Sequence, residues 1–159
     1  MFQLIRDRPR TVDLEEFLSR PLFAHLATDS ELGPRESPVW FLWDDGAVWI
    51  IGSRRDNSFP ARIERDPRCA IGVVDFEREH GRVHHVGLRG RASVEPFDPE
   101  RAHRLLRRYL GNRVDAWDPR FRETLQDPDN VLIRFDPETV VARDQSYEVE
   151  ENNPPALGQ

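Results

Sequence analysis

Lysine is absent from this chain, and cysteine and methionine occur once each. The 23 basic residues are therefore all arginine. Because no side chain carries a primary amine, the chain cannot hold pyridoxal through a Schiff base, and lysine-linked pyridoxal chemistry is excluded. The single Cys69 lies in an apolar run, which excludes an internal disulfide and indicates a core thiol in a reducing compartment.

Long apolar runs are missing as well. There is no stretch of about 18 apolar residues and no signal-peptide pattern, so we expect a soluble, cytoplasmic protein that does not enter a membrane. A net charge of −6 and a pI near 5.4 argue against binding to nucleic acid. The 159 residues predict one domain over residues 1–147 and a disordered acidic tail over 148–159. The sequence also lacks a Walker loop, a GxGxxG motif after a strand and a Ser-His-Asp order. It therefore gives no support to a hydrolase or a nucleotide triphosphatase function.

Turn and cap residues divide the chain into short strands and a few short helices. Asp45-Gly46 between two aromatic-rich runs predicts a tight hairpin. Asp13, Ser58, Asp98-Pro99 and Asp118-Pro119 predict helix starts. Strands are predicted over 22–28, 37–43, 47–51, 69–75 and 86–94, with closing strands over 131–135 and 139–143. This pattern favours a mainly β (α+β) fold with about six strands in a small antiparallel barrel.

The segment after the hairpin carries the best candidate for a binding site. Its second strand ends in Ser53-Arg54-Arg55, and Ser58 opens the following helix. Hydroxyls, guanidinium groups and free helix amides together offer a place for a phosphate. Because Trp40 and Phe41 lie on the preceding strand, the combination suits a flat aromatic cofactor with a phosphate tail. In the alternative reading, the loop arginines form surface ion pairs with Asp56 or Glu64, and the aromatic rings are ordinary core.

The same motifs resemble a known family. The order SPVWF, acidic-Gly turn, GSRR, short helix and RDPR before a strand is similar to the flavin-binding split barrels related to pyridoxamine 5'-phosphate oxidase. The resemblance runs from about Leu14 to Tyr147. It implies a six-stranded antiparallel split barrel of the FMN-binding type, FMN or a deazaflavin as cofactor, and a homodimer. The residues that it places at the cofactor are Val39, Trp40, Phe41, Ser53, Arg54, Arg55, Ser58, Phe59 and Arg62.

One departure from the family concerns the phosphate. Family members often carry a lysine in the first turn of this helix, where the chain has Phe59-Pro60. Either Arg54, Arg55 or Arg62 takes over the phosphate, or the site is altered or vacant.

The resemblance implies an FMN-dependent oxidoreductase that acts on a small molecule. The alternatives are a deazaflavin-dependent reductase and a non-catalytic, stress-associated protein that binds flavin or haem. No catalytic side chain is predicted, because a flavin carries the hydride itself.

Two further groups of residues have weaker claims to function. His84 and His85 are adjacent in a strand and point to opposite faces, so they cannot share one metal ion, and we expect no metal site. Arg89 and Arg91 share a strand face and could reach a cofactor, but ion pairs with neighbouring strands are the favoured reading.

Overall fold

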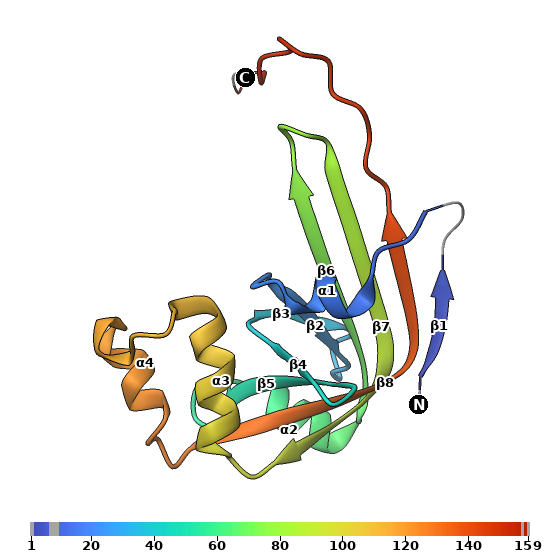
Figure 1. Ribbon diagram of the computed structural model, residues 1–159. Coiled ribbons are helices and arrows are strands. Elements are labelled where there is room, and N and C mark those ends of the chain that lie inside the picture. Colours follow the sequence, from blue (N-terminus) through green and yellow to red (C-terminus); the bar gives the residue numbers. More distant parts are fainter. Residues whose placement is uncertain (1, 7–9, 157, 159) are drawn as a thin grey trace.

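Eight strands form one strongly curved sheet in the computed structural model, which describes residues 2–6, 10–156 and 158 (Figure 1). The strand order is β3-β2-β6-β7-β8-β5-β4, all antiparallel, and β1 adds to β8 in parallel. The strands are β1 (Gln3–Arg6), β2 (Ala24–Thr28), β3 (Arg35–Val39), β4 (Leu42–Asp44), β5 (Ala47–Ser53), β6 (Arg68–Glu77), β7 (Arg82–Glu95) and β8 (Asn130–Asp144). The sheet curls into a half-barrel, which confirms the split-barrel fold.

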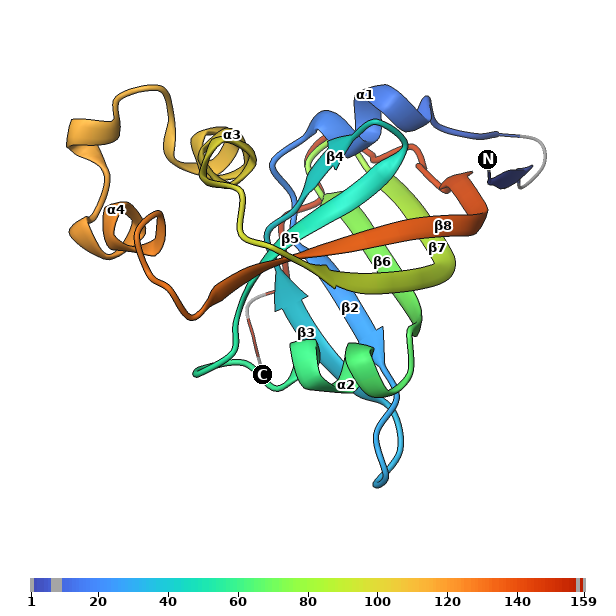
Figure 2. The same cartoon turned by 90° about the horizontal axis from the view of Figure 1, so that it is seen from below.

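Short helices cover the ends and one outer side of this barrel (Figure 2). α2 lies at one end, beside β2 and β3, whereas α3 and α4 lie outside β5. Asp98 accepts hydrogen bonds from the backbone amides of Glu100 and Arg101, and Asp13 caps α1 in the same way. The helices are α1 (Leu14–Ser19), α2 (Phe59–Arg65), α3 (Pro99–Leu110), the 3-10 turn η1 (Val114–Ala116) and α4 (Pro119–Thr124).

The division of the chain into strands differs from the sequence prediction at two places, and β1 was not predicted. The strand expected over 37–43 is split at Trp40-Phe41, because β3 pairs with β2 whereas β4 pairs with β5. This crossing carries the chain from one edge of the sheet to the other. The two closing strands are one continuous strand, β8, which bonds to β5 through its first half and to β7 along its length.

Asp45 and Gly46 form the expected hairpin turn between β4 and β5. Both residues have positive φ, 53° and 70°, as a two-residue turn of the primed type requires.

A second glycine is needed in β7, where the pairing with β8 shifts register between Arg89 and Gly90. A Cβ atom at Gly90 would lie 2.1 Å from the carbonyl oxygen of Asp136, so the two strands approach closely there.

Apolar side chains form two separate clusters. The larger one fills the barrel and includes Phe17, Phe41 and Phe135, all with no exposed surface. The smaller one lies between the outer face of β5 and the segment α3–α4, and it includes Trp49 and Trp117. The second cluster therefore attaches the helical segment to the barrel.

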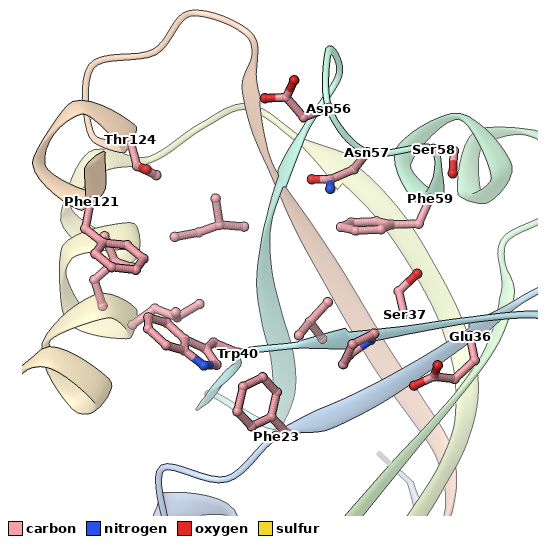
Figure 3. A pocket seen from close by; sticks show the side chains of 15 residues that line it. Phe23, Glu36, Ser37, Trp40, Asp56, Asn57, Ser58, Phe59, Phe121 and Thr124 are labelled. Carbon is pink, nitrogen blue, oxygen red and sulfur yellow. The ribbon is translucent and has the colours of Figure 1, made fainter. Parts of the chain in front are cut away.

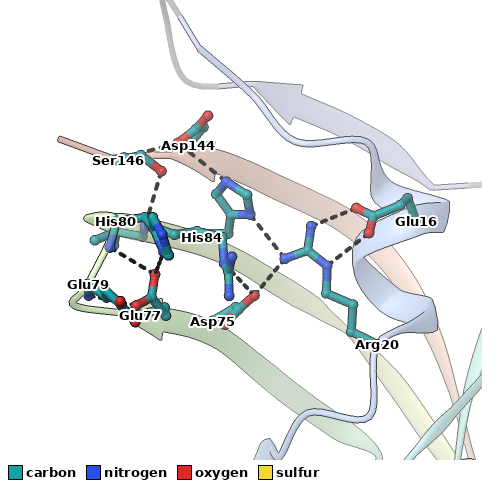
Figure 4. A network of polar contacts seen from close by, with 11 residues as sticks. Glu16, Arg20, Asp75, Glu77, Glu79, His80, His84, Asp144 and Ser146 are labelled. Atoms are coloured by element: carbon teal, nitrogen blue, oxygen red, sulfur yellow. Dashed lines mark hydrogen bonds and ion pairs between the residues drawn. The ribbon is translucent and has the colours of Figure 1, made fainter. Parts of the chain in front are cut away.

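A polar network joins α1 to the long β6–β7 hairpin (Figure 4). Arg20 bonds to Asp75 at 2.6 Å and to Glu16 at 2.7 Å, and it approaches Nδ1 of His84 at 3.1 Å. The other ring nitrogen of His84 lies 3.5 Å from Asp144. Both nitrogens of His84 thus face protein partners, which gives this histidine a structural role.

Among the described residues, no helix is long and apolar enough to cross a membrane.

Candidate functional site

An open cleft of about 650 Å³ lies between the barrel and the helical segment (Figure 3). It forms where β3 ends, where β5 turns into α2, and where α3 and α4 face these two strands. We call it the aromatic cleft. Its lining residues are Phe23, Glu36, Ser37, Pro38, Val39, Trp40, Ile51, Asp56, Asn57, Ser58, Phe59, Leu105, Leu106, Phe121 and Thr124.

Aromatic rings gather at one end of the cleft. The Trp40 ring stacks on Tyr109 with the ring centroids 4.5 Å apart and the planes at 2°. It also stacks on Phe121 at 5.3 Å, and Phe23 meets its edge at 6.5 Å. The Tyr109 hydroxyl donates to the carbonyl of Leu22 at 2.7 Å and accepts from the amide of Phe41 at 3.1 Å. Tyr109 therefore links the backbone that follows Trp40 to the segment that leads into β2, and its ring packs on the Trp40 ring.

The opposite end of the cleft is polar and continues into a second pocket. Glu36, Ser37 and Ser58 line both spaces, so the two adjoin. The second pocket has a volume of about 610 Å³, and we call it the arginine pocket after three of its lining residues. These are Arg35, Arg62 and Arg65.

Positive charge in the arginine pocket is incompletely balanced. Arg65 lies 3.6 Å from Glu31, whose side chain is 88% exposed. Among the residues that the structure describes, no carboxylate lies within ion-pair distance of Arg35 or Arg62. Burial, with the nearby charges of Arg35 and Arg65, lowers the pKa of the Arg62 guanidinium from its ordinary value. An anion in this pocket would relieve that repulsion.

Arg62 is held in place by two hydroxyl groups. Its Nε donates to the Thr28 hydroxyl at 2.7 Å, and one terminal nitrogen donates to the Ser58 hydroxyl at 2.5 Å. Ser58 is the N-cap residue of α2, but its side chain does not cap the helix amides. Ser58 lies at the start of α2, as the sequence predicted, but its hydroxyl bonds to the Arg62 side chain instead of to the helix amides. The pair forms a preorganised group of donors at the mouth between the two pockets.

The other predicted arginines have protein partners outside both pockets. Arg54 bonds to Glu64 at 2.6 Å, and Arg55 bonds to Asp127 and Asp129 at 2.9 and 3.1 Å. These contacts match the alternative reading of the loop as a surface with ion pairs. Arg62 is the one of the three candidate arginines that lines the arginine pocket.

The remaining predicted residues divide into two groups. Val39, Trp40, Ser58 and Phe59 line the aromatic cleft. Phe41 does not line it, because its side chain is fully buried in the barrel core. Its carbonyl also accepts hydrogen bonds from Arg108 and Tyr109.

Ser53 lies on the far side of the loop. The residue is 8% exposed, its backbone amide donates to the side-chain oxygen of Asn57 at 2.8 Å, and it lines a smaller hollow that it shares with Arg55. It therefore does not line either of the two adjoining pockets.

Several residues of the site escaped the sequence analysis, among them Phe23, Phe121 and Arg35. Phe23 and Phe121 lie far from the SPVWF strand along the chain, and Arg35 stands two residues before it, at the start of β3. No local motif marks any of them. The fold brings them together, and only the register of β2 against β3 would have placed Phe23 near Trp40.

The comparison with known families fits this geometry. A sequence profile of the pyridoxamine 5'-phosphate oxidase family matches residues 11–144. The chain belongs to this family. No curated protein matches it.

Solved structures of similar fold extend the comparison. A conserved hypothetical protein from Mycobacterium tuberculosis is 21% identical and superimposes with a TM-score of 0.69, covering 92% of this chain and 98% of that one. A protein titled F420 reductase is 26% identical with a TM-score of 0.61, covering 82% and 98%. General Stress Protein 26 from Bacillus anthracis is 16% identical with a TM-score of 0.61, covering 86% and 95%. The similarities to the Mycobacterium tuberculosis protein and to General Stress Protein 26 are evidence for the fold alone.

Proposed function

We propose that this member of the family binds flavin mononucleotide and acts as a flavin-dependent oxidoreductase on a small molecule. The observation that supports it best is the continuity of an aromatic cleft with a pocket of three arginines through Glu36, Ser37 and Ser58. A flavin mononucleotide has the matching division into a planar ring and a phosphate tail. The volume of the cleft also lies in the range of about 300–1,000 Å³ that small-molecule sites have.

Each part of the cofactor has candidate partners on the chain. Val39, Trp40 and Phe59 offer apolar surface to the ring, and Ser58, Arg62 and Arg35 offer hydroxyl and guanidinium donors to the phosphate. Arg62 thus takes the role that a lysine has in many relatives. When bound, a flavin supplies the hydride chemistry, while the chain binds the cofactor, orients it and limits access of water.

Titration with flavin mononucleotide tests the proposal directly. Purified protein is expected to bind it with a shift of the visible flavin band and to retain it through gel filtration. With the cofactor bound, reduction by a nicotinamide donor or reoxidation by an organic acceptor is expected to be faster than with free flavin. Protein that ignores added flavin contradicts the proposal. Binding without any turnover favours instead the non-catalytic, stress-associated role.

A deazaflavin is the second candidate cofactor. Two observations favour it: the similarity to a protein titled F420 reductase, and a pocket of three arginines, which can also serve a tail with several negative charges. A deazaflavin whose tail carries several carboxylates would engage Arg35 and Arg65 in addition to Arg62. Titration of both cofactors side by side, at low and high salt, separates the two, because the more highly charged tail gives the stronger salt dependence.

A further inference from the structure

The crossing at Trp40-Phe41 has no neighbouring strand to hold it. Neither residue belongs to β3 or β4, and the Phe41 side chain has no exposed surface. A buried amide or carbonyl without a hydrogen bond costs free energy. The backbone of Phe41 therefore needs hydrogen-bond partners from outside the sheet.

Two adjacent side chains near the end of α3 supply these partners. The amide of Phe41 donates to the Tyr109 hydroxyl at 3.1 Å, and its carbonyl accepts from a terminal nitrogen of Arg108. The other terminal nitrogen of Arg108 donates to the carbonyls of Leu18 and Arg20 at 3.0 and 2.8 Å. α3 thus joins the crossing to the end of α1.

Arg108 spends its charge on backbone carbonyls alone. Among the residues that the structure describes, no carboxylate lies within ion-pair distance of Arg108. Burial lowers the pKa of this guanidinium from its ordinary value. Because the N–H donors of a guanidinium form a rigid planar fork, Arg108 fixes its carbonyl partners relative to one another.

The contact between Arg108 and Phe41 joins two parts of the cleft lining. Val39 and Trp40, which line the cleft, directly precede Phe41 in the chain. Leu105 and Leu106, which also line it, precede Arg108 within α3. The separation of these two parts therefore depends on a contact that lies outside the cleft itself.

We propose that Arg108 is a positioning residue for the cofactor site, which sets the separation between α3 and the crossing and with it the shape of the aromatic cleft. Arg108 does not line the cleft, so it acts through Phe41. The inference rests on the proposed function, because binding of flavin mononucleotide reports the shape of the cleft. A binding site whose supporting residues are loosened loses affinity even when every lining residue is kept.

Arg108→Met tests this role, because methionine is also unbranched but cannot donate a hydrogen bond. It is expected to weaken FMN binding by about tenfold. Arg104→Gln is the matched control on the same face of α3, where Arg104 bonds to Asp44 through both terminal nitrogens at 3.0 Å. The control removes the same charge without touching the crossing, and it should change affinity less than about twofold. Flavin fluorescence titration measures both.

A conservative variant separates geometry from charge. Arg108→Lys keeps the charge but loses the planar fork, so it is expected to recover at most about threefold of the lost affinity. Tyr109→Phe keeps the ring that packs on Trp40 and loses only the hydroxyl, and it should weaken FMN binding by about threefold. Thermal melting checks that each variant is folded. If Arg108→Met does not fold, Tyr109→Phe decides the test with the same readouts.

Hydrogen exchange without any cofactor gives an independent readout. In Arg108→Met, the backbone amides of residues 38–44 are expected to exchange about tenfold faster than in the wild type. Residues 86–90 of β7, which pair with β6 and β8, should exchange at the wild-type rate. Mass spectrometry of peptic fragments follows both segments.

The outcomes separate the two proposals. Unchanged exchange at the crossing, or equal acceleration in β7, overturns the inference. A folded Arg108→Met variant with wild-type affinity for FMN also overturns it, and so does full rescue by Arg108→Lys. A wild-type chain that ignores FMN contradicts the proposed function, whereas exchange at the crossing still shows whether Arg108 holds this segment.

Discussion

Arg62 is the residue on which the proposed cofactor site depends most. Its guanidinium lines the arginine pocket, has no carboxylate partner among the described residues, and is fixed by Thr28 and Ser58. Arg62→Gln is expected to weaken FMN binding by about tenfold to a hundredfold, because a charge-assisted hydrogen bond to the phosphate is lost. The matched control Arg54→Gln removes an exposed arginine that pairs with Glu64, and it should change affinity less than about twofold. Titration of flavin fluorescence measures both. Equal losses in the two variants would place the phosphate elsewhere.

Cys69 provides a test of burial at the residue scale. Burial raises the pKa of its thiol to about 11. Alkylation requires the thiolate, so at pH 8 iodoacetamide should modify the native protein about a hundredfold more slowly than the urea-unfolded chain. The native rate should rise about tenfold per pH unit up to the raised pKa, because each unit below it leaves a tenth of the thiolate. Mass spectrometry follows the single modification. Rapid labelling of folded protein at pH 8 would show that Cys69 is accessible.

At the scale of elements, the register shift between β7 and β8 requires glycine at position 90. A methyl group there would meet the carbonyl oxygen of Asp136 at 2.1 Å, and backbone cannot move aside as a side chain can. Gly90→Ala is therefore expected to lower the free energy of unfolding by about 2 to 3 kcal/mol. Ser93→Ala is the control, because this exposed side chain on the same strand bonds to Glu95 at the surface and not to β8. Urea unfolding of both variants gives the comparison, and equal stabilities would mean that the strands separate at the bulge without cost.

Features that depend on neighbouring residues were predicted from the sequence, whereas features that depend on distant strands were not. Asp13, Asp98 and Asp45-Gly46 were informative because a cap or a turn depends on neighbouring residues. The split at Trp40-Phe41 was not predicted, since it follows from pairing with two distant strands, β2 and β5. In the site, Trp40, Ser58 and Arg62 came from a motif, whereas Phe121 and Arg35 come from segments that only the fold brings together.

At the scale of the whole molecule, the outer face of the sheet leaves apolar side chains uncovered. Val74 and Phe76 on β6 are 51% and 61% exposed, and they share this face with Gly72. Gly72 pairs with His25 on one side and Gly87 on the other, so the middle of the face is flat. A second sheet can approach closely over glycines. The family resemblance predicts a homodimer, and this face is a better place for its interface than the strand around Trp40 and Phe41, because Phe41 is buried in the core.

Gly72→Arg tests pairing of two chains through this face. The wild-type protein is expected to scatter light as a particle of about twice the chain mass of 18.6 kDa, because a two-fold pairing buries two copies of one patch. An arginine at position 72 has open space in the single chain, yet it would project charge into the interface. The variant should therefore be a folded monomer, whereas Arg107→Glu on the exposed surface of α3 keeps the dimer. The family resemblance implies a cofactor site built from both chains, so FMN affinity should fall together with dimerisation. If the Gly72→Arg variant still forms dimers, the interface lies on another face, and if it is a monomer that binds FMN at full affinity, one chain alone makes the site.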